Sequence, residues 1–339
     1  MVFMKIAIVK LSALGDIVHA MAVMQFIKNN NNKILIDWIV EKNYKGLLEF
    51  HPDINKIHII NIKQAKKKKS LLLLFSELKK TKKFGPYDLV VDMQGLIKSA
   101  LISRLVPSAV TLGFHKTSTR ERIASILYNK TFKYDYDENV IERNLAIITF
   151  ALGLDFNKKE ILQKSPFLYS SKQYVFEDLS NIKKNILLIP GASYLAKCYP
   201  MEKFVELTKK IDTNFIIIWG NENERAVANK IKYQSTNINV NVSEALSFDV
   251  LISLINQVDL VIGPDTGPTH MAWALNIPSI TLFGPTPGLR NTYITKINKV
   301  IESDSKVNPR KIDKNDYSIK NINVNHVVKI SESLLHINQ

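Results

Sequence analysis

Residues able to do acid–base chemistry follow the first apolar run of the chain. Residues 4–9 are strand-like, and the next seven read Lys-Leu-Ser-Ala-Leu-Gly-Asp, ending at Asp16. Gly15 permits close approach to the backbone, and Asp16 lies at the start of a predicted helix, where its charge suits the helix dipole. This carboxylate could act as a general base or could be an ordinary helix cap. The motif G-x-G-x-x-G is absent, which argues against a nicotinamide dehydrogenase.

A more specific turn lies in the second half of the chain, over residues 263–272, which read Gly-Pro-Asp-Thr-Gly-Pro-Thr-His-Met-Ala. Backbone N–H groups around Thr266 and Gly267, together with the dipole of the following helix, form a site for a pyrophosphate. The alternative makes Asp265 a turn-former and His270 a helix residue packed against the sheet.

Basic residues gather in three places. Lys197 lies between a buried strand and a helix, where it could meet a phosphate, although the chain has 39 lysines and an isolated one is usually solvated. The lysine-rich run 63–69 precedes the apolar residues 71–75 and resembles an interfacial segment for anionic lipid. The alternative is a solvated face, with residues 71–74 in the core. A loop with Arg120 and Arg122 suits phosphate or carboxylate recognition.

Alternating apolar runs and helix-like segments predict two doubly wound α/β domains, 1–165 and 166–339, that would place these turns at the carboxyl ends of parallel strands. A ligand would then lie in the cleft that the domains face. A last helix over 324–336 could pack back on the first domain. The predicted strands are 5–11, 34–41, 57–62, 87–92, 110–114, 185–190, 215–220, 260–263 and 279–284. The predicted helices are 16–29, 43–50, 70–83, 96–105, 200–211, 222–233, 247–256 and 268–275.

Composition narrows the class of protein. A length of 339 residues suits about two domains, and the single cysteine, Cys198, excludes an intrachain disulfide and a Cys-rich zinc site. No apolar run is long enough for a membrane span or a signal peptide, so a cytoplasmic protein is expected. The net charge of +15 is uneven, with +12 over residues 1–170, and it suggests a polyanionic partner. Nucleic acid is disfavoured because no aromatic residues interleave with the basic run.

The turns and loops together resemble a known family. Residues 10–20, 92–99, 119–121, Lys197 before Pro200, and 263–270 with 282–288 are similar to the bacterial lipopolysaccharide heptosyltransferases of glycosyltransferase family 9. Residues 37–41 and 94–99 are most similar to the members that add the first heptose. The resemblance implies a GT-B fold, in which two Rossmann-like domains face a central cleft, with the acceptor on the first and the nucleotide sugar on the second. Ala192 and Tyr199 depart from the Thr and Trp common in the family.

The resemblance also implies roles for residues. Asp16 would deprotonate the acceptor hydroxyl, and Lys197 would hold the departing ADP. Asp265 would contact the heptose hydroxyls, and Glu224, ahead of Glu222, would bind ribose. The implied donor-binding residues are Ser193, Glu222, Glu224, Asp265, Thr266, Gly267 and His270. The implied acceptor-binding residues are Ser12, Gly15, Lys63, Lys66, Lys67 and Arg120.

The implied reaction is an inverting transfer of heptose from ADP-L-glycero-D-manno-heptose to the first Kdo (3-deoxy-D-manno-octulosonic acid) of Kdo2-lipid A, without a metal ion or other cofactor. The enzyme would be peripheral to the cytoplasmic face of the inner membrane and would meet its anionic surface. A transferase for the second heptose, or another family 9 transferase, is the alternative within the family. A non-catalytic protein that binds anionic glycolipid is the alternative of a different class.

Overall fold

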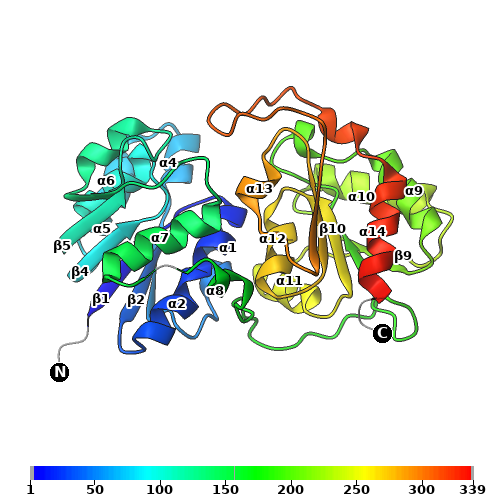
Figure 1. Ribbon diagram of the computed structural model, residues 1–339, viewed down its shortest axis with the longest axis horizontal. Coiled ribbons are helices and arrows are strands. Elements are labelled where there is room, and N and C mark those ends of the chain that lie inside the picture. Colours follow the sequence, from blue (N-terminus) through cyan, green and yellow to red (C-terminus); the bar gives the residue numbers. More distant parts are fainter. Residues whose placement is uncertain (1–3, 156, 337–339) are drawn as a thin grey trace. The chain divides into compact units, whose positions relative to one another are not determined.

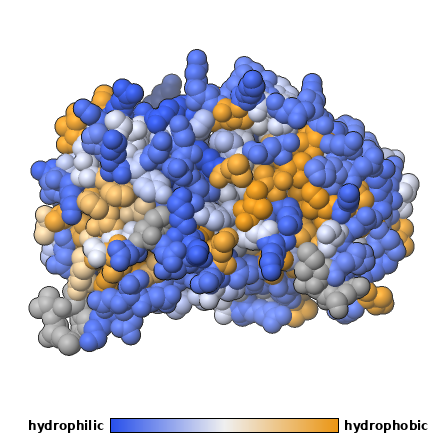
Figure 2. Space-filling model, viewed as in Figure 1, coloured by the Kyte–Doolittle hydropathy of each residue, from blue (hydrophilic) through white to orange (hydrophobic). Residues whose placement is uncertain are grey.

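Each half of the chain folds around one parallel six-stranded sheet. The computed structural model describes residues 4–155 and 157–336. The chain divides into two units, Met1–Phe167 and Leu168–Gln339, each with helices flanking its sheet (Figure 1). The face drawn in Figure 2 is mostly hydrophilic, with hydrophobic residues in separate groups over both units.

The first unit has the strand order β3-β2-β1-β4-β5-β6. Its strands are β1 (Lys5–Val9), β2 (Leu35–Glu41), β3 (Lys56–Ile60), β4 (Tyr87–Asp92), β5 (Ser108–Phe114) and β6 (Lys130–Phe132). Its helices are α1 (Leu14–Met21), α2 (Val23–Asn30), α3 (Lys45–Leu48), α4 (Ile62–Lys67), α5 (Leu71–Thr81), α6 (Ile97–Leu105), α7 (Val140–Leu152) and α8 (Lys159–Leu162), with 3-10 turns η1 (Lys42–Tyr44) and η2 (Arg122–Leu127). The single helix predicted over 16–29 is therefore two, which meet at Ala22.

The second unit repeats this order as β12-β11-β10-β7-β8-β9. Its strands are β7 (Asn185–Leu188), β8 (Asn214–Ile217), β9 (Val240–Val242), β10 (Leu260–Pro264), β11 (Ser279–Phe283) and β12 (Asn298–Glu302). Its helices are α9 (Met201–Lys210), α10 (Glu222–Gln234), α11 (Phe248–Ile255), α12 (Gly267–Ala274), α13 (Gly288–Asn291) and α14 (Val324–His336), with 3-10 turns η3 (Leu195–Lys197) and η4 (Ser318–Asn321). Helix α14 packs against α9, β10 and β11.

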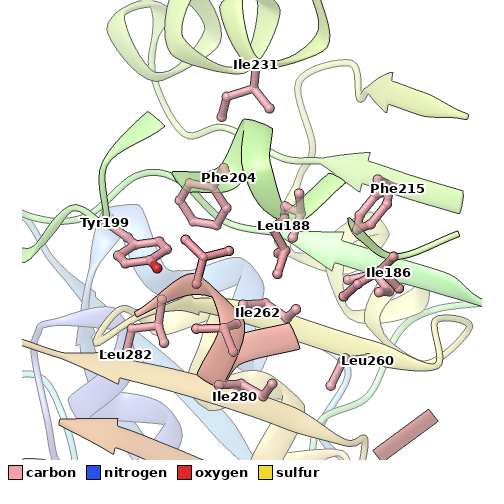
Figure 3. Packing of buried hydrophobic residues seen from close by; sticks show 14 of the residues in the cluster. Ile186, Leu188, Tyr199, Phe204, Phe215, Ile231, Leu260, Ile262, Ile280 and Leu282 are labelled. Carbon is pink, nitrogen blue, oxygen red and sulfur yellow. The ribbon is translucent and has the colours of Figure 1, made fainter. Parts of the chain in front are cut away.

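The core of the second unit shows why these apolar runs form strands. Every second residue of four adjacent strands points to one face of the sheet, where α9 and α10 cover it with Phe204 and Ile231 (Figure 3). The opposite face buries Leu187 and Val261 as well. Strands buried on both faces favour continuous apolar runs over an alternating pattern. The sheet residues of the first face are Ile186, Leu188, Phe215, Ile217, Leu260, Ile262, Ile280 and Leu282.

The strand order places a switch point in each sheet. In the first unit β1 pairs with β2 on one side and β4 on the other, and in the second unit β7 pairs with β8 and β10. The connections after the two central strands depart in opposite directions there, which opens a crevice at the carboxyl ends of the strands. The candidate turns follow β1, β4, β7 and β10, so they lie at these two points.

None of the helices among the described residues combines the length and the apolar character needed to cross a membrane.

Candidate active site

The turn after β1 presents Asp16 to solvent in the first turn of α1. Its Oδ2 accepts a hydrogen bond of 3.0 Å from the backbone N–H of Ala13, the N-cap residue just before the helix. Among the described residues Oδ1 has no hydrogen-bond partner. The Ser12–Ala13 peptide bond is cis. Asp16 thus has part of the capping role considered from the sequence, yet it retains an accessible oxygen that could accept a proton.

The turn after β4 holds this segment in place through Gln94. The Gln94 Oε1 accepts a hydrogen bond of 2.8 Å from the N–H of Leu11, and its Nε2 donates one of 2.8 Å to the carbonyl of Ser12. Lys98 Nζ donates to Ser12 Oγ at 3.1 Å. Asp92 is fully buried beneath, where burial raises the pKa of its carboxyl group. The two turns therefore form one hydrogen-bonded edge at the switch point.

Asp92 in turn shapes the loop that carries Gln94. It accepts hydrogen bonds from the N–H groups of Gln94 and Gly95, at 2.8 and 3.1 Å, and from the Tyr128 hydroxyl at 2.8 Å. Gly95 has a φ of +68°, in the left-handed region that glycine adopts most easily. The sequence resemblance includes this loop but gives no role to Gln94 or Asp92.

The predicted Arg120 is brought to the same edge by its neighbours. Thr119 donates its hydroxyl hydrogen to the carbonyl of Gly95, and Glu121 accepts a hydrogen bond of 2.7 Å from the N–H of Ile97. The Arg120 side chain between them is exposed. Its guanidinium is thus carried by a loop tied to the β4 turn on both sides.

Lys63, Lys66 and Lys67 of the basic run belong to α4, which starts at this edge. Glu41, at the end of β2, is buried and accepts a hydrogen bond of 3.2 Å from the N–H of Lys63. Burial raises the pKa of Glu41 despite the nearby charges of Lys98 and Lys63. Burial, together with the charges of Glu41 and Asp16, also raises the pKa of Tyr44. Among the predicted acceptor residues, Lys63, Lys66 and Lys67 are exposed, and Ser12 and Gly15 are half-buried.

The second unit brings two predicted residues, Lys197 and His270, to the carboxylate of a third, Asp265. Lys197 Nζ lies 2.7 Å from Asp265 Oδ2, and His270 Nε2 lies 2.8 Å from Asp265 Oδ1. Asn291, on α13, adds a hydrogen bond of 3.3 Å from its Nδ2 to Oδ2. Burial alone would raise the pKa of Asp265, but the charge of Lys197 and the hydrogen bond to His270 hold it well below its usual range. Asp265 is therefore an anion that fixes a lysine and a histidine.

The N-terminus of α12 adjoins this cluster. Thr266 precedes the first helical residue, Gly267, and Pro268 occupies the first turn. Thr269 donates its hydroxyl hydrogen to the carbonyl of Pro264 at 2.9 Å, which holds the turn closed. The first N–H groups of a helix have no intrahelical acceptor, so this end can receive an anionic group.

Glu224 and Glu222 occupy different positions. The Glu224 Oε2 accepts a hydrogen bond of 2.8 Å from the N–H of Gly220, and a Cβ atom on Gly191 would lie only 2.2 Å from the Glu224 carboxyl carbon. The carboxylate of Glu224 thus touches the turn after β7. Glu222 is exposed on α10, 3.6 Å from Arg225. The predicted Ser193 is exposed in the turn after β7.

Over residues 4–155 and 157–336 there is no group of three or more His, Cys, Asp or Glu side chains that could hold a metal ion.

Comparison with known proteins identifies the family. The profile of "Glycosyltransferase family 9 (heptosyltransferase)" matches residues 75–318. The chain belongs to this family. Lipopolysaccharide heptosyltransferase 1 of Campylobacter coli is 38% identical over 98% of this chain and 99% of its own length, and the protein of the same name from Pseudomonas aeruginosa is 27% identical over 86% and 81%. The solved structure "E. coli heptosyltransferase WaaC with ADP" has a TM-score of 0.78 at 23% identity, over 98% of this chain and 100% of that one.

These matches confirm three predictions from the sequence: the family, the GT-B fold class with two Rossmann-like units, and glycosyltransferase activity. The roles of individual residues stay predictions. Gln94 and Asn291 are among the site residues for which the sequence predicts no role, and their contacts depend on turns that meet only in the folded sheets.

Proposed function

We propose that this family 9 glycosyltransferase moves L-glycero-D-manno-heptose from ADP-L-glycero-D-manno-heptose to the first Kdo of Kdo2-lipid A, in the synthesis of the lipopolysaccharide inner core. The observation that carries the proposal is the Lys197–Asp265–His270 cluster beside the N-terminus of α12. It is supported by two relatives named lipopolysaccharide heptosyltransferase 1 and by a similar fold that binds ADP in the E. coli structure.

The second unit would bind the donor. The N–H groups of Thr266 and Gly267 would meet the diphosphate, and Lys197 would move from Asp265 toward the leaving phosphate as its charge develops. Asp265 would then accept hydrogen bonds from heptose hydroxyls, with His270 and Asn291 keeping its orientation. Glu224 would take the ribose hydroxyls, with Ser193 and Glu222 beside the nucleotide.

The first unit would bind the acceptor. Asp16 would take the proton from the Kdo hydroxyl while the oxygen attacks the anomeric carbon of heptose. The bond from this carbon to the diphosphate breaks as the new glycosidic bond forms, so ADP leaves and the configuration inverts. Arg120, Lys63, Lys66 and Lys67 would meet carboxylates and phosphates of the acceptor, with Ser12 and Gly15 beside Kdo.

We propose that the transfer needs no metal ion or other cofactor, because Lys197 and the α12 amides supply the positive charge that a departing diphosphate requires. The proposed location is the cytoplasmic face of the inner membrane, where an anionic surface would attract the excess positive charge of residues 1–170.

The test is to incubate the purified protein with ADP-heptose and Kdo2-lipid A, with and without a chelator, and to detect the product by mass spectrometry. One heptose should be added to the heptose-free acceptor at an unchanged rate with chelator. Transfer only to an acceptor that already carries one heptose would instead assign the second-heptose reaction. Loss of transfer with the chelator would refute the metal-free step.

A further inference from the structure

Helix α5 exposes more apolar surface than its packing in the first unit requires. Leu71, Leu72 and Phe75 are 70%, 84% and 67% exposed. Leu74 and Leu78 are partly buried on the same helix, and Leu78 packs against the core. At about 100° per residue, Leu71 and Phe75 follow Leu78 around the helix and Leu72 extends the arc. The core therefore covers only part of the apolar face of α5.

Polar contacts fix the hairpin of α4 and α5 in this orientation. Glu41 accepts the N–H of Lys63 at the start of α4, as described above. Glu77, on α5, accepts a hydrogen bond of 2.8 Å from the N–H of Asn61 just before α4. Ser70 is the N-cap residue of α5, and its hydroxyl oxygen accepts a hydrogen bond of 3.3 Å from the N–H of Leu73. The uncovered leucines thus belong to an anchored helix, and its outer face keeps one orientation.

Lysines border this apolar face at both ends. Residues 63–83 contain nine lysines and a single acidic residue, Glu77. The side chains of residues 66–69 before α5 and of Lys79, Lys82 and Lys83 at its end are exposed. Apolar side chains with a cationic border match the boundary of an anionic bilayer, where acyl chains adjoin headgroup phosphates. A second copy of this face would repel the first because the charges are alike.

A second pair of exposed apolar side chains lies on another element of the first unit. Ile123 and Ile126, on η2, are 65% and 78% exposed. The short helix η2 contacts α6, and α6 contacts α5. Apolar side chains are thus exposed on more than one element of this neighbourhood.

We infer that the outer face of α5 docks on an anionic lipid bilayer, with Leu71, Leu72 and Phe75 in the headgroup–acyl boundary and the flanking lysines on headgroup phosphates. The inference rests on the proposed function, which requires a lipid-linked acceptor. It also fits the site, because α4 starts at the edge that carries Asp16: the N–H of Glu41 donates to the carbonyl of Leu11 at 3.3 Å. The docked helix would keep this edge close to the sugars of a membrane-bound glycolipid.

The test measures binding to vesicles by co-sedimentation, with phosphatidylcholine alone or mixed with phosphatidylglycerol. The wild-type chain should bind the mixed vesicles and bind the neutral ones far less. Leu72→Ser/Phe75→Ser should weaken binding to the mixed vesicles by tenfold or more, since it removes two of the three apolar side chains that would enter the bilayer. Lys79→Gln/Lys82→Gln/Lys83→Gln should weaken it by about fivefold per lysine, an effect that salt removes.

The matched control is Val175→Ser/Ile182→Ser, which removes two apolar side chains of 93% and 97% exposure from the second unit. It should bind like the wild type. Any of three results would overturn the inference. The α5 variant could bind the mixed vesicles as well as the wild type does, or the control could lose as much binding as the α5 variant. The wild type could also bind both kinds of vesicle equally. A change in the sedimentation coefficient of the α5 variant without vesicles would also overturn it, by assigning the face to self-association.

A second assay separates this inference from the proposed function. ADP release with a deacylated, water-soluble Kdo2-lipid A acceptor needs no bilayer, so the α5 variant should match the wild type there. If the wild type turns over normally and the α5 variant still binds vesicles like the wild type, the docking inference is refuted and the proposed function is not. Absence of turnover by the wild type would refute the proposed function whatever the vesicles show.

Discussion

The ion pair of Lys197 and Asp265 allows a structural contribution to be separated from a chemical one. Nζ and Oδ2 are 2.7 Å apart, and the side chains are only 11% and 9% exposed. Removing one partner of a buried pair leaves an unpaired charge, at a cost of about 3–5 kcal/mol. Because His270 and Asn291 still bind Asp265 in Lys197→Met, we expect the free energy of unfolding to fall by about 3 kcal/mol.

The double variant Lys197→Met/Asp265→Asn removes both charges, so it should be more stable than Lys197→Met. A double-mutant cycle from urea unfolding should give a coupling energy of about 2 kcal/mol. The control is Lys184 and Asp259 in the same unit, a 3.0 Å pair with 38% and 26% exposure, where we expect less than about 1 kcal/mol. Equal coupling in both pairs would contradict the argument from burial.

The catalytic rate of Lys197→Met and of the double variant should not follow their stability. Both variants should lose about 10²–10³-fold in kcat, because the positive charge that would stabilise the leaving diphosphate is gone in each. The assay is ADP release at saturating donor, well below the unfolding transition. If the double variant regains turnover together with stability, Lys197 acts only by neutralising Asp265, and its role toward the diphosphate is refuted.

Three further outcomes are expected. Gln94→Ala should lower kcat about tenfold, because it removes the hydrogen bonds that hold the backbone of Leu11 and Ser12 before Asp16. The affinity for ADP, measured by calorimetry, should not change, and an altered affinity would contradict this prediction. Gly191→Ala should displace the Glu224 carboxylate and so lower the affinity for ADP about tenfold. The free energy of unfolding should change by less than about 1 kcal/mol. An unaltered affinity for ADP would show that Glu224 does not bind the nucleotide. Burial alone would raise the pKa of Asp37, but hydrogen bonds, first of all the one to His58, lower it to about 2. About 2 kcal/mol of the free energy of unfolding that is present above pH 4 should therefore be lost as the pH falls toward 2. Asp37→Asn should reduce this loss of stability at acidic pH.

The sequence predicted the parts of the fold that depend on local pattern. The central strands were found because strands buried on both faces read as apolar runs, and the turns after β1, β7 and β10 follow directly from their ends. Short strands at the sheet edges, such as β9 over Val240–Val242, lack enough residues for such a run. Helix α7 was not predicted. It is buried continuously from Ile141 to Thr149, so its polar residues Glu142, Arg143 and Asn144 do not mark an exposed face.

The contacts of the site also differ in how far they could be predicted from the sequence. Asp265 and His270 are five residues apart on one strand-to-helix turn, so their proximity could be expected from sequence. The contact of Gln94 with Ser12 joins residues 82 positions apart, and it exists because β4 pairs with β1 rather than with a sequential neighbour. Strand order is a property of the whole sheet, and the local pattern around Gln94 does not contain it.

The central claim is that Asp16 removes the acceptor proton during heptose transfer. Single-turnover ADP release by Asp16→Asn, compared with the wild type and with Asp53→Asn as a control carboxylate, tests it most directly. The account predicts a fall of about 10²-fold or more in rate for Asp16→Asn, with ADP affinity unchanged and Asp53→Asn normal. Transfer by Asp16→Asn at the wild-type rate would contradict it.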